Sequence, residues 1–170
     1  MDPNATSEPA VPKNPTTVER TSDREMRVTR TFDAPARLVF EAWATPELFK
    51  RWWAPRSMGV PLRSCAMDVR VGGGYRIEFG HEGAPPMAFF GTYVEVTPHS
   101  RLSWTNEESP DGAITTVTFG ERDGKTLLVL HELYPSKEAL EASLGGLDMA
   151  AEQFGQLDEL LATLDAGGQR

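Results

Sequence analysis

The sequence predicts a single α+β domain, in which a curved antiparallel sheet wraps around a long C-terminal helix. Apolar and polar residues alternate with period two in the centre of the chain, in short segments separated by turn residues. One apolar stripe with helical spacing follows this region. Antiparallel strands with one apolar face need a cover, and only this C-terminal segment is long enough to be that cover.

The first residues of the chain differ in composition from the rest. Residues 1–24 contain four prolines and many Ser and Thr residues, but almost no large apolar side chains. Such a segment buries too little surface to offset the entropy lost on ordering, so we expect a disordered tail. We expect the domain over residues 25–166, followed by a short C-terminal end at 167–170.

The domain is expected to begin with a strand and two short helices. The strand starts near Glu25, where the period-two pattern begins. The helices follow over about 36–44 and 47–53. We expect Asp33 to cap the first helix and Thr45 to cap the second, because short polar side chains accept hydrogen bonds from the first turn.

Six more strands are expected before the last helix. They lie near 62–70, 74–80, 87–97, 101–107, 113–121 and 125–134. Asp123-Gly124 is typical of a tight hairpin turn. Gly72-Gly73-Gly74 precedes a strand and not a helix, so these residues indicate a turn and exclude a phosphate-binding loop.

The C-terminal helix is expected to begin after Ser136, an acceptable N-cap. Its apolar stripe consists of Leu140, Leu144, Leu147, Ala151, Phe154, Leu157, Leu161 and Leu164. Glycine inside a helix costs about 1 kcal/mol against alanine. Gly145, Gly146 and Gly155 therefore indicate either close packing or room for a ligand.

Charge and composition exclude several classes of function. The formal net charge is −8, whereas nucleic-acid binding needs a clustered basic surface. No run reaches the roughly 18 apolar residues of a membrane span. No basic and apolar leader is visible at the N-terminus, and the lone Cys65 cannot form an intrachain disulfide. We therefore expect a cytoplasmic protein.

A sheet curved around one helix leaves a central space. We expect this space either to be filled as an ordinary core or to be a cavity for a flat or elongated apolar molecule. The predicted ligand-binding residues are Trp53, Tyr75, Ile77, Phe79, Phe89, Tyr93, Trp104, Val117, Phe119, Leu128, Leu130, Leu147, Phe154 and Leu157. For the adjacent Trp52 and Trp53, about 100° apart on a helix, we expect one side chain inside and the other near the surface or the cavity mouth.

Glu132 is the one candidate catalytic residue. It shares a strand face with Leu128 and Leu130, which places a carboxylate on the inner face. Burying a carboxylate is costly unless it is paired, hydrogen-bonded or protonated. Glu132 is therefore either an acid facing a ligand or a solvent-exposed or ion-paired side chain at the strand end.

Other kinds of site have little support in the sequence. His81, His99 and His131 have no pairing at helical spacing, and Cys65 has no second cysteine nearby, so we expect no metal and no cofactor. No serine nucleophile motif is present.

The chain resembles the SRPBCC superfamily (START/Bet v 1-like, helix-grip fold), and within it the Aha1-like group named after the activator of the Hsp90 ATPase. The most specific segments of the resemblance are Trp52-Trp53-Ala54-Pro55 and Val71-Gly72-Gly73-Gly74-Tyr75, and further segments lie between about residues 25 and 165. Many relatives carry a Gly-Trp step in the last helix, whereas this chain has Gly145-Gly146-Leu147. The resemblance implies a helix-grip scaffold, and it leaves the function open because the superfamily hosts very different activities.

Three functions fit this scaffold. The leading one is the binding of a hydrophobic small molecule or lipid in the cavity between the sheet and the last helix. The second is a cyclase, dehydratase or isomerase that uses the same pocket. The third is a protein-interaction module like the Hsp90 co-chaperone, with a protein as partner. The sequence does not predict an oligomeric state.

Overall fold

The computed structural model describes residues 15–81, 83–144 and 149–168. Within them an antiparallel sheet has the strand order β1-β2-β8-β7-β6-β5-β4-β3. The strands are β1 (Thr17–Arg20), β2 (Glu25–Phe32), β3 (Leu62–Met67), β4 (Gly74–Phe79), β5 (Met87–Thr97), β6 (Arg101–Thr105), β7 (Ile114–Arg122) and β8 (Lys125–Leu133). The helices are α2 (Ala36–Ala44), α3 (Pro46–Phe49), the 3-10 helix η1 (Arg56–Met58), α4 (Lys137–Ser143) and α5 (Ala150–Gly168).

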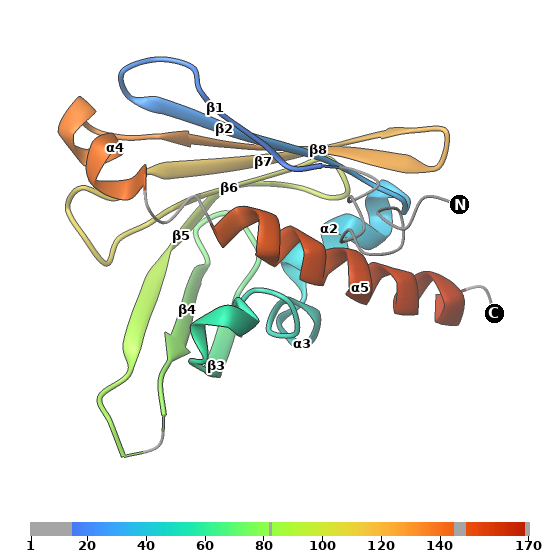
Figure 1. Ribbon diagram of the computed structural model, residues 1–170, viewed down its shortest axis with the longest axis horizontal. Helices are drawn as coiled ribbons and strands as arrows, with labels where there is room; N and C mark the ends of the chain where they lie inside the picture. The colour runs from blue at the N-terminus through green and yellow to red at the C-terminus, as the bar shows by residue number, and fades with distance from the viewer. Residues whose placement is uncertain (1–14, 82, 145–148, 169–170) are drawn as a thin grey trace, which may run out of the picture.

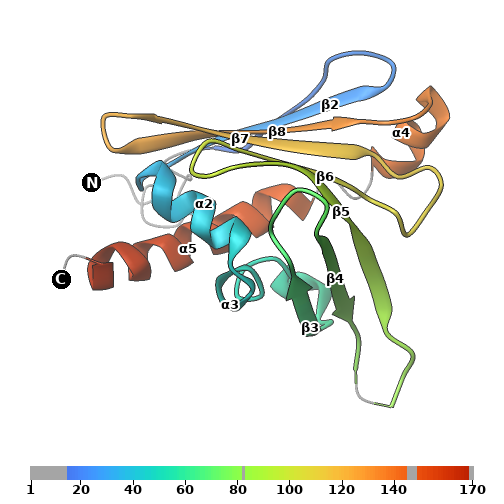
Figure 2. The same cartoon turned by 180° about the vertical axis from the view of Figure 1, so that it is seen from behind.

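The sheet is strongly curved, and α5 lies on its concave side (Figures 1 and 2). Strands β3, β4 and β5 turn away from the direction of β2, β7 and β8. The pairing of β5 with β6 shifts register between Tyr93 and Glu95, and such an irregularity bends a strand. Two residues earlier, a Cβ on Gly91 would lie 1.9 Å from the Thr105 carbonyl oxygen. The close approach of these two strands therefore requires glycine at position 91.

The apolar face of α5 covers the inside of the sheet. Phe154, Leu157 and Leu161 are buried in the main core. The ring of Phe154 meets that of Phe32 edge-on, with centroids 5.6 Å apart. Burial of each such side chain stabilises the fold by about 1.5–3 kcal/mol. The helix is also tied to β2 by an ion pair between Asp158 and the buried Arg30.

Helix α4 packs into a second apolar cluster, separate from the main core. Ala139 and Leu140 of α4 pack with Met26, Ala113 and Tyr134. The Ser136 hydroxyl caps this helix by accepting a hydrogen bond from the Ala139 N–H at 3.0 Å. The chain after β8 therefore buries two separate apolar faces.

The α+β helix-grip fold that the sequence predicts is confirmed, and two short helices precede β3 as expected. The six predicted strands of the centre correspond to β3 to β8, and the predicted bounds of β5 are reproduced. Asp123 and Gly124 both have positive φ, 56° and 78°, in the tight hairpin between β7 and β8.

The expected N-terminal tail needs a correction. Residues 1–14 lie outside the described residues, but Thr17–Arg20 forms the strand β1 on the edge of the sheet. All four of its residues are exposed, so no apolar alternation marks it. Backbone pairing with β2 and an ion pair between Glu19 and Arg27 hold it instead.

The single long helix predicted after Ser136 is wrong in its extent. The structure describes two helices, α4 and α5, and residues 145–148 between them lie outside the described residues. In the sequence the helical spacing of leucines runs on from α4 to α5, although the two helices pack into different apolar clusters.

Helix capping and length also differ at α2 and α3. The N-cap of α2 is Pro35 and not Asp33, and the Glu121 carboxylate accepts the hydrogen bond of the first helical N–H, on Ala36. Thr45 is the N-cap of α3, as expected, but its side chain makes no capping hydrogen bond. The helix α3 itself ends at Phe49, earlier than predicted.

Candidate functional site

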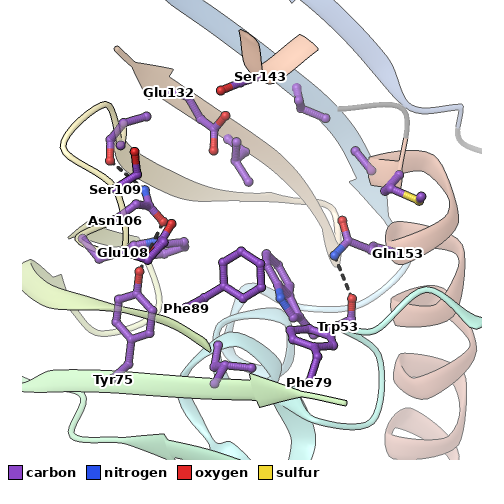
Figure 3. A pocket seen from close by; sticks show the side chains of 18 of the residues that line it. Trp53, Tyr75, Phe79, Phe89, Asn106, Glu108, Ser109, Glu132, Ser143 and Gln153 are labelled. Carbon is purple, nitrogen blue, oxygen red and sulfur yellow. Dashed lines mark hydrogen bonds between the residues drawn. The ribbon is translucent and has the colours of Figure 1, made fainter. Parts of the chain in front are cut away.

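A cavity of about 570 Å³ lies between the concave face of the sheet and the helices. Its wall takes side chains from β2, β3, β4, β5, β6 and β8, from α2, α3, η1, α4 and α5, and from the segment after α3 and the loop between β6 and β7. Figure 3 shows Trp53, Phe79 and Phe89 on one side of the space and Glu132 and Ser143 on the other. The cavity thus has an aromatic side and a polar side.

Most of the predicted ligand-binding residues lie in this wall. Those that line the cavity are Trp53, Tyr75, Ile77, Phe79, Phe89, Tyr93, Trp104, Leu130 and Phe154. The strand alternation explains this result, because Tyr75, Ile77 and Phe79 are the buried positions of β4.

The remaining predicted ligand-binding residues do not line the cavity. Val117, Phe119, Leu128 and Leu157 are fully or almost fully buried in the main core. They share the inward faces of β7, β8 and α5, but other side chains fill the space around them. Leu147 lies outside the described residues.

The two adjacent tryptophans have different environments. Trp52 is fully buried, and its indole N–H donates a hydrogen bond to the Ala42 carbonyl oxygen at 3.0 Å. Trp53 is half-buried, stacks on Phe49 with ring centroids 4.7 Å apart, and lines the cavity. One tryptophan is therefore part of the core, while the other presents its ring to the cavity.

A chain of hydrogen bonds crosses the polar side of the cavity. The Tyr75 hydroxyl donates to the Thr105 carbonyl oxygen at 2.8 Å and lies 3.2 Å from Asn106 Oδ1. Asn106 Nδ2 donates to Thr115 Oγ1 at 3.0 Å. This hydroxyl in turn donates to Glu132 Oε2 at 3.2 Å.

Glu132 lies at the end of this chain. It is half-buried, on the same face of β8 as the buried Leu128 and Leu130, and it lines the cavity. Its second oxygen, Oε1, accepts a hydrogen bond of 2.6 Å from the Tyr134 hydroxyl. Of the two alternatives that the sequence leaves open, the structure therefore has the carboxylate facing the cavity, held by two neutral hydroxyl groups.

The tyrosines of the wall are held in their protonated form. Burial, with a smaller contribution from the nearby Glu108, raises the pKa of Tyr75 well above its usual range. Burial also raises the pKa of Tyr93, and burial together with the adjacent Glu132 raises the pKa of Tyr134. Near neutral pH these hydroxyl groups therefore stay protonated, and those of Tyr75 and Tyr134 donate hydrogen bonds.

Sequence reasoning missed a polar set on the loop between β6 and β7. Asn106, Glu108, Ser109 and Asp111 line the cavity there. For Asn106 a signal was present, because the predicted strand 101–107 includes it and the alternation of Leu102 and Trp104 places it on the same inward face. Glu108, Ser109 and Asp111 lie beyond that strand, where no periodic pattern marks a residue as inward and only the turn signal near Pro110 located the loop. The methionines Met58, Met67, Met87 and Met149 were also missed, although flexible apolar side chains of this kind suit an adaptable binding wall.

The described ranges contain no group of three or more His, Cys, Asp or Glu side chains placed to hold a metal ion. Within the same ranges no helix is both long enough and apolar enough to cross a membrane.

Comparisons with known proteins agree on one fold. The sequence matches the family model described as Activator of Hsp90 ATPase homolog 1-like protein over residues 33–164. No curated protein matches the sequence.

Solved structures extend the similarity to most of the chain. A Rhodobacter sphaeroides protein is 22% identical with a TM-score of 0.78, covering 88% of this chain and 99% of its own. Ms6760 from Mycobacterium smegmatis is 25% identical with a TM-score of 0.75, covering 86% and 97%. CalU16 from Micromonospora echinospora is 19% identical with a TM-score of 0.59, covering 88% and 85%. These likenesses establish the fold and leave the ligand open.

Proposed function

The chain belongs to the family of Activator of Hsp90 ATPase homolog 1-like proteins, and from that premise we propose that it binds a small hydrophobic molecule or lipid in the cavity between sheet and α5. The cavity is the observation that carries this proposal. Its volume of about 570 Å³ falls within the range of about 300–1,000 Å³ that is typical of small-molecule sites. A mostly apolar wall with a few convergent polar groups is also typical of such sites.

Exposed apolar side chains beside the cavity support the same proposal. Met58, Met87 and Phe89 line the cavity, yet their exposed fractions are 37%, 52% and 36%. They come from η1 and from the start of β5. Large apolar side chains left in contact with water beside a cavity suit a route by which an apolar ligand enters.

A pair of neighbouring alanines offers a matched test. Ala150 is buried and lines the cavity, whereas Ala151 is exposed. We expect Ala150→Phe to place a phenyl ring in the cavity and to weaken binding of the neutral fluorescent probe N-phenyl-1-naphthylamine at least tenfold. Ala151→Phe, which makes the same change at the next position, should bind like the wild type.

The readout is probe fluorescence, with circular dichroism to show that both variants are folded. Equal binding by the wild type and by a folded Ala150→Phe would place the probe elsewhere and contradict the proposal. Absence of binding by the wild type for every apolar probe would contradict it as well.

A catalytic role of the same pocket is the second candidate, and one observation favours it. The Glu132 carboxylate and the Tyr134 hydroxyl, 2.6 Å apart, both line the cavity. A carboxylate and a phenol in one pocket suit a cyclase, dehydratase or isomerase that needs proton transfer. With a substrate in hand, Glu132→Gln should lower kcat at least a hundredfold while binding persists. Unchanged turnover would remove Glu132 from the mechanism.

Location and protein partners are the remaining parts of the proposal. We keep the cytoplasmic location expected from the sequence, because the lone Cys65 has no intrachain partner for a disulfide. The family description also names an activator of the Hsp90 ATPase. An effect of this chain on the Hsp90 ATPase rate would add a protein partner, and an unchanged rate would exclude that role.

A further inference from the structure

We propose that the ligand carries a positively charged nitrogen at one end of an apolar body, so that the pocket selects amines over acids of the same shape. This inference rests on the proposed function, because it names the class of molecule that the same cavity prefers.

The charged residues of the cavity wall are all acidic among those the structure describes. Glu108, Asp111 and Glu132 line it, whereas none of its described lining residues is Lys, Arg or His. Glu108 and Asp111 are exposed at the loop between β6 and β7, and Glu132 is half-buried on β8. A bound cation would therefore be attracted by carboxylates on this loop and on β8, whereas a bound anion would be repelled by them.

These carboxylates have no cationic partner among the described residues. Glu132 accepts hydrogen bonds from two neutral hydroxyls, and Glu108 accepts one from the Phe90 backbone N–H at 3.2 Å. Several carboxylates outside the cavity do have a cationic partner. Glu95 and Glu159, for example, form ion pairs of 2.8 Å with Arg101 and Arg56. Since a carboxylate has about four lone-pair sites, Glu132 keeps capacity for donors from a ligand.

The arrangement of the two sides fits an amphipathic cation. Figure 3 shows Glu132, Glu108 and Ser109 around one part of the space, and Trp53 and Phe79 around the other. An apolar body against the aromatic rings would bring its nitrogen toward the carboxylates. Aromatic faces add to this preference, because they attract cations through the ring quadrupole.

Three naphthalene compounds of similar shape test the selection. They are 1-naphthylmethylamine as the cation, 1-naphthylmethanol as the neutral form and 1-naphthoate as the anion. We expect the amine to bind at least tenfold more tightly than the alcohol, and the anion to bind most weakly, in displacement of a neutral fluorescent probe. Raising the salt concentration should weaken the binding of the amine but not that of the other two compounds, because salt screens part of the attraction between the amine and the exposed carboxylates of the loop.

Variants test whether the carboxylates of the cavity wall cause the preference for the amine. Glu132→Gln should weaken the binding of the amine about tenfold and leave the binding of the alcohol unchanged, because a hydrogen bond to a charged group contributes about 1.5–3 kcal/mol. Glu108→Gln, on the exposed loop, should have a smaller effect of the same sign, and it keeps the test open if the first variant does not fold. Glu95→Gln is the matched control, because it removes one negative charge away from the cavity.

The possible outcomes separate this inference from the proposed function. If the alcohol binds but the amine binds no better, or if Glu132→Gln and Glu95→Gln act alike, the charge selection is wrong and the cavity still binds apolar molecules. If none of the three compounds nor the neutral probe binds, the proposed function fails and this inference fails with it.

Discussion

Gln156 offers a sharp test of how α5 positions the cavity wall. Its side chain is only 5% exposed. The amide Nε2 donates hydrogen bonds to the Trp52 and Ala54 carbonyl oxygens at 2.8 and 2.9 Å, and Oε1 accepts one from the Arg56 N–H at 2.9 Å. One side chain thus satisfies three backbone groups of the segment that carries the cavity-lining Trp53.

Gln156→Leu removes all three hydrogen bonds while keeping a side chain of similar size. At about 1 kcal/mol for each bond, the free energy of unfolding should fall by about 3 kcal/mol. For a chain of this length that loss corresponds to a decrease in Tm of about 6–12 °C. Gln153→Leu is the matched control. This residue makes one such bond, to the Trp53 carbonyl oxygen at 2.7 Å, so its loss should be about 1 kcal/mol.

Urea denaturation followed by tryptophan fluorescence measures both values. The reasoning is refuted if Gln156→Leu costs no more than Gln153→Leu, because the number of satisfied backbone groups would then not determine the loss. A variant of unchanged stability would show that the segment after α3 does not depend on α5.

Three further predictions concern stability, pH and reactivity. Gly91→Ala should destabilise the fold by about 3 kcal/mol in thermal unfolding, because its Cβ would overlap the Thr105 carbonyl oxygen. Gly120→Ala is the control, because the nearest atom to its Cβ lies at 3.9 Å, and its stability should remain close to that of the wild type. Hydrogen bonds from Ser57 hold the pKa of the Glu152 carboxyl below its ordinary value of 4.5. The stabilisation that the ionised Glu152 provides is therefore complete above pH 4.5 and is lost as the pH falls through its lowered pKa. In Glu152→Gln, the free energy of unfolding should therefore depend less on pH below pH 4.5 than in the wild type. Burial raises the pKa of the Cys65 thiol from 9.0 to about 11, so iodoacetamide should react about a hundredfold more slowly with the folded protein than with the unfolded chain at pH 8.

Each of these predictions has a result that would contradict it. Equal stability of the two alanine variants would show that β5 and β6 can separate without cost at Gly91. An acid profile that Glu152→Gln leaves unaltered would exclude this carboxylate as a contributor. Alkylation of Cys65 at the same rate in the folded and the unfolded state would exclude a raised pKa.

The strand residues of the site could be predicted because alternation carries the information. Tyr75, Ile77 and Phe79 recur with period two, and one buried face follows from that pattern. The same pattern placed Glu132 on the inner face with Leu130. It could not distinguish Leu130, which lines the cavity, from Leu128, which is packed in the core, because both share one face of β8.

The features that the sequence did not predict have no periodic signal of their own. The strand β1 is exposed at every position, so only its backbone pairing with β2 defines it. Glu108 and Asp111 face the cavity from a loop, where the path of the backbone determines the direction of a side chain. The sequence predicts α4 and α5 as one helix because the leucine spacing continues from one to the other without a change of period.

Methyl NMR of methionine tests the central claim most directly, because the chain carries its own control. Met58, Met67, Met87 and Met149 line the cavity, whereas Met26 is buried in the second apolar cluster and does not line it. On titration with an apolar ligand, we predict that the methyl signals of the four lining residues shift together and saturate, while the Met26 signal changes little. Shifts that leave the four lining methyls unchanged, or that move Met26 as much as the others, would contradict a ligand-binding cavity between the sheet and α5.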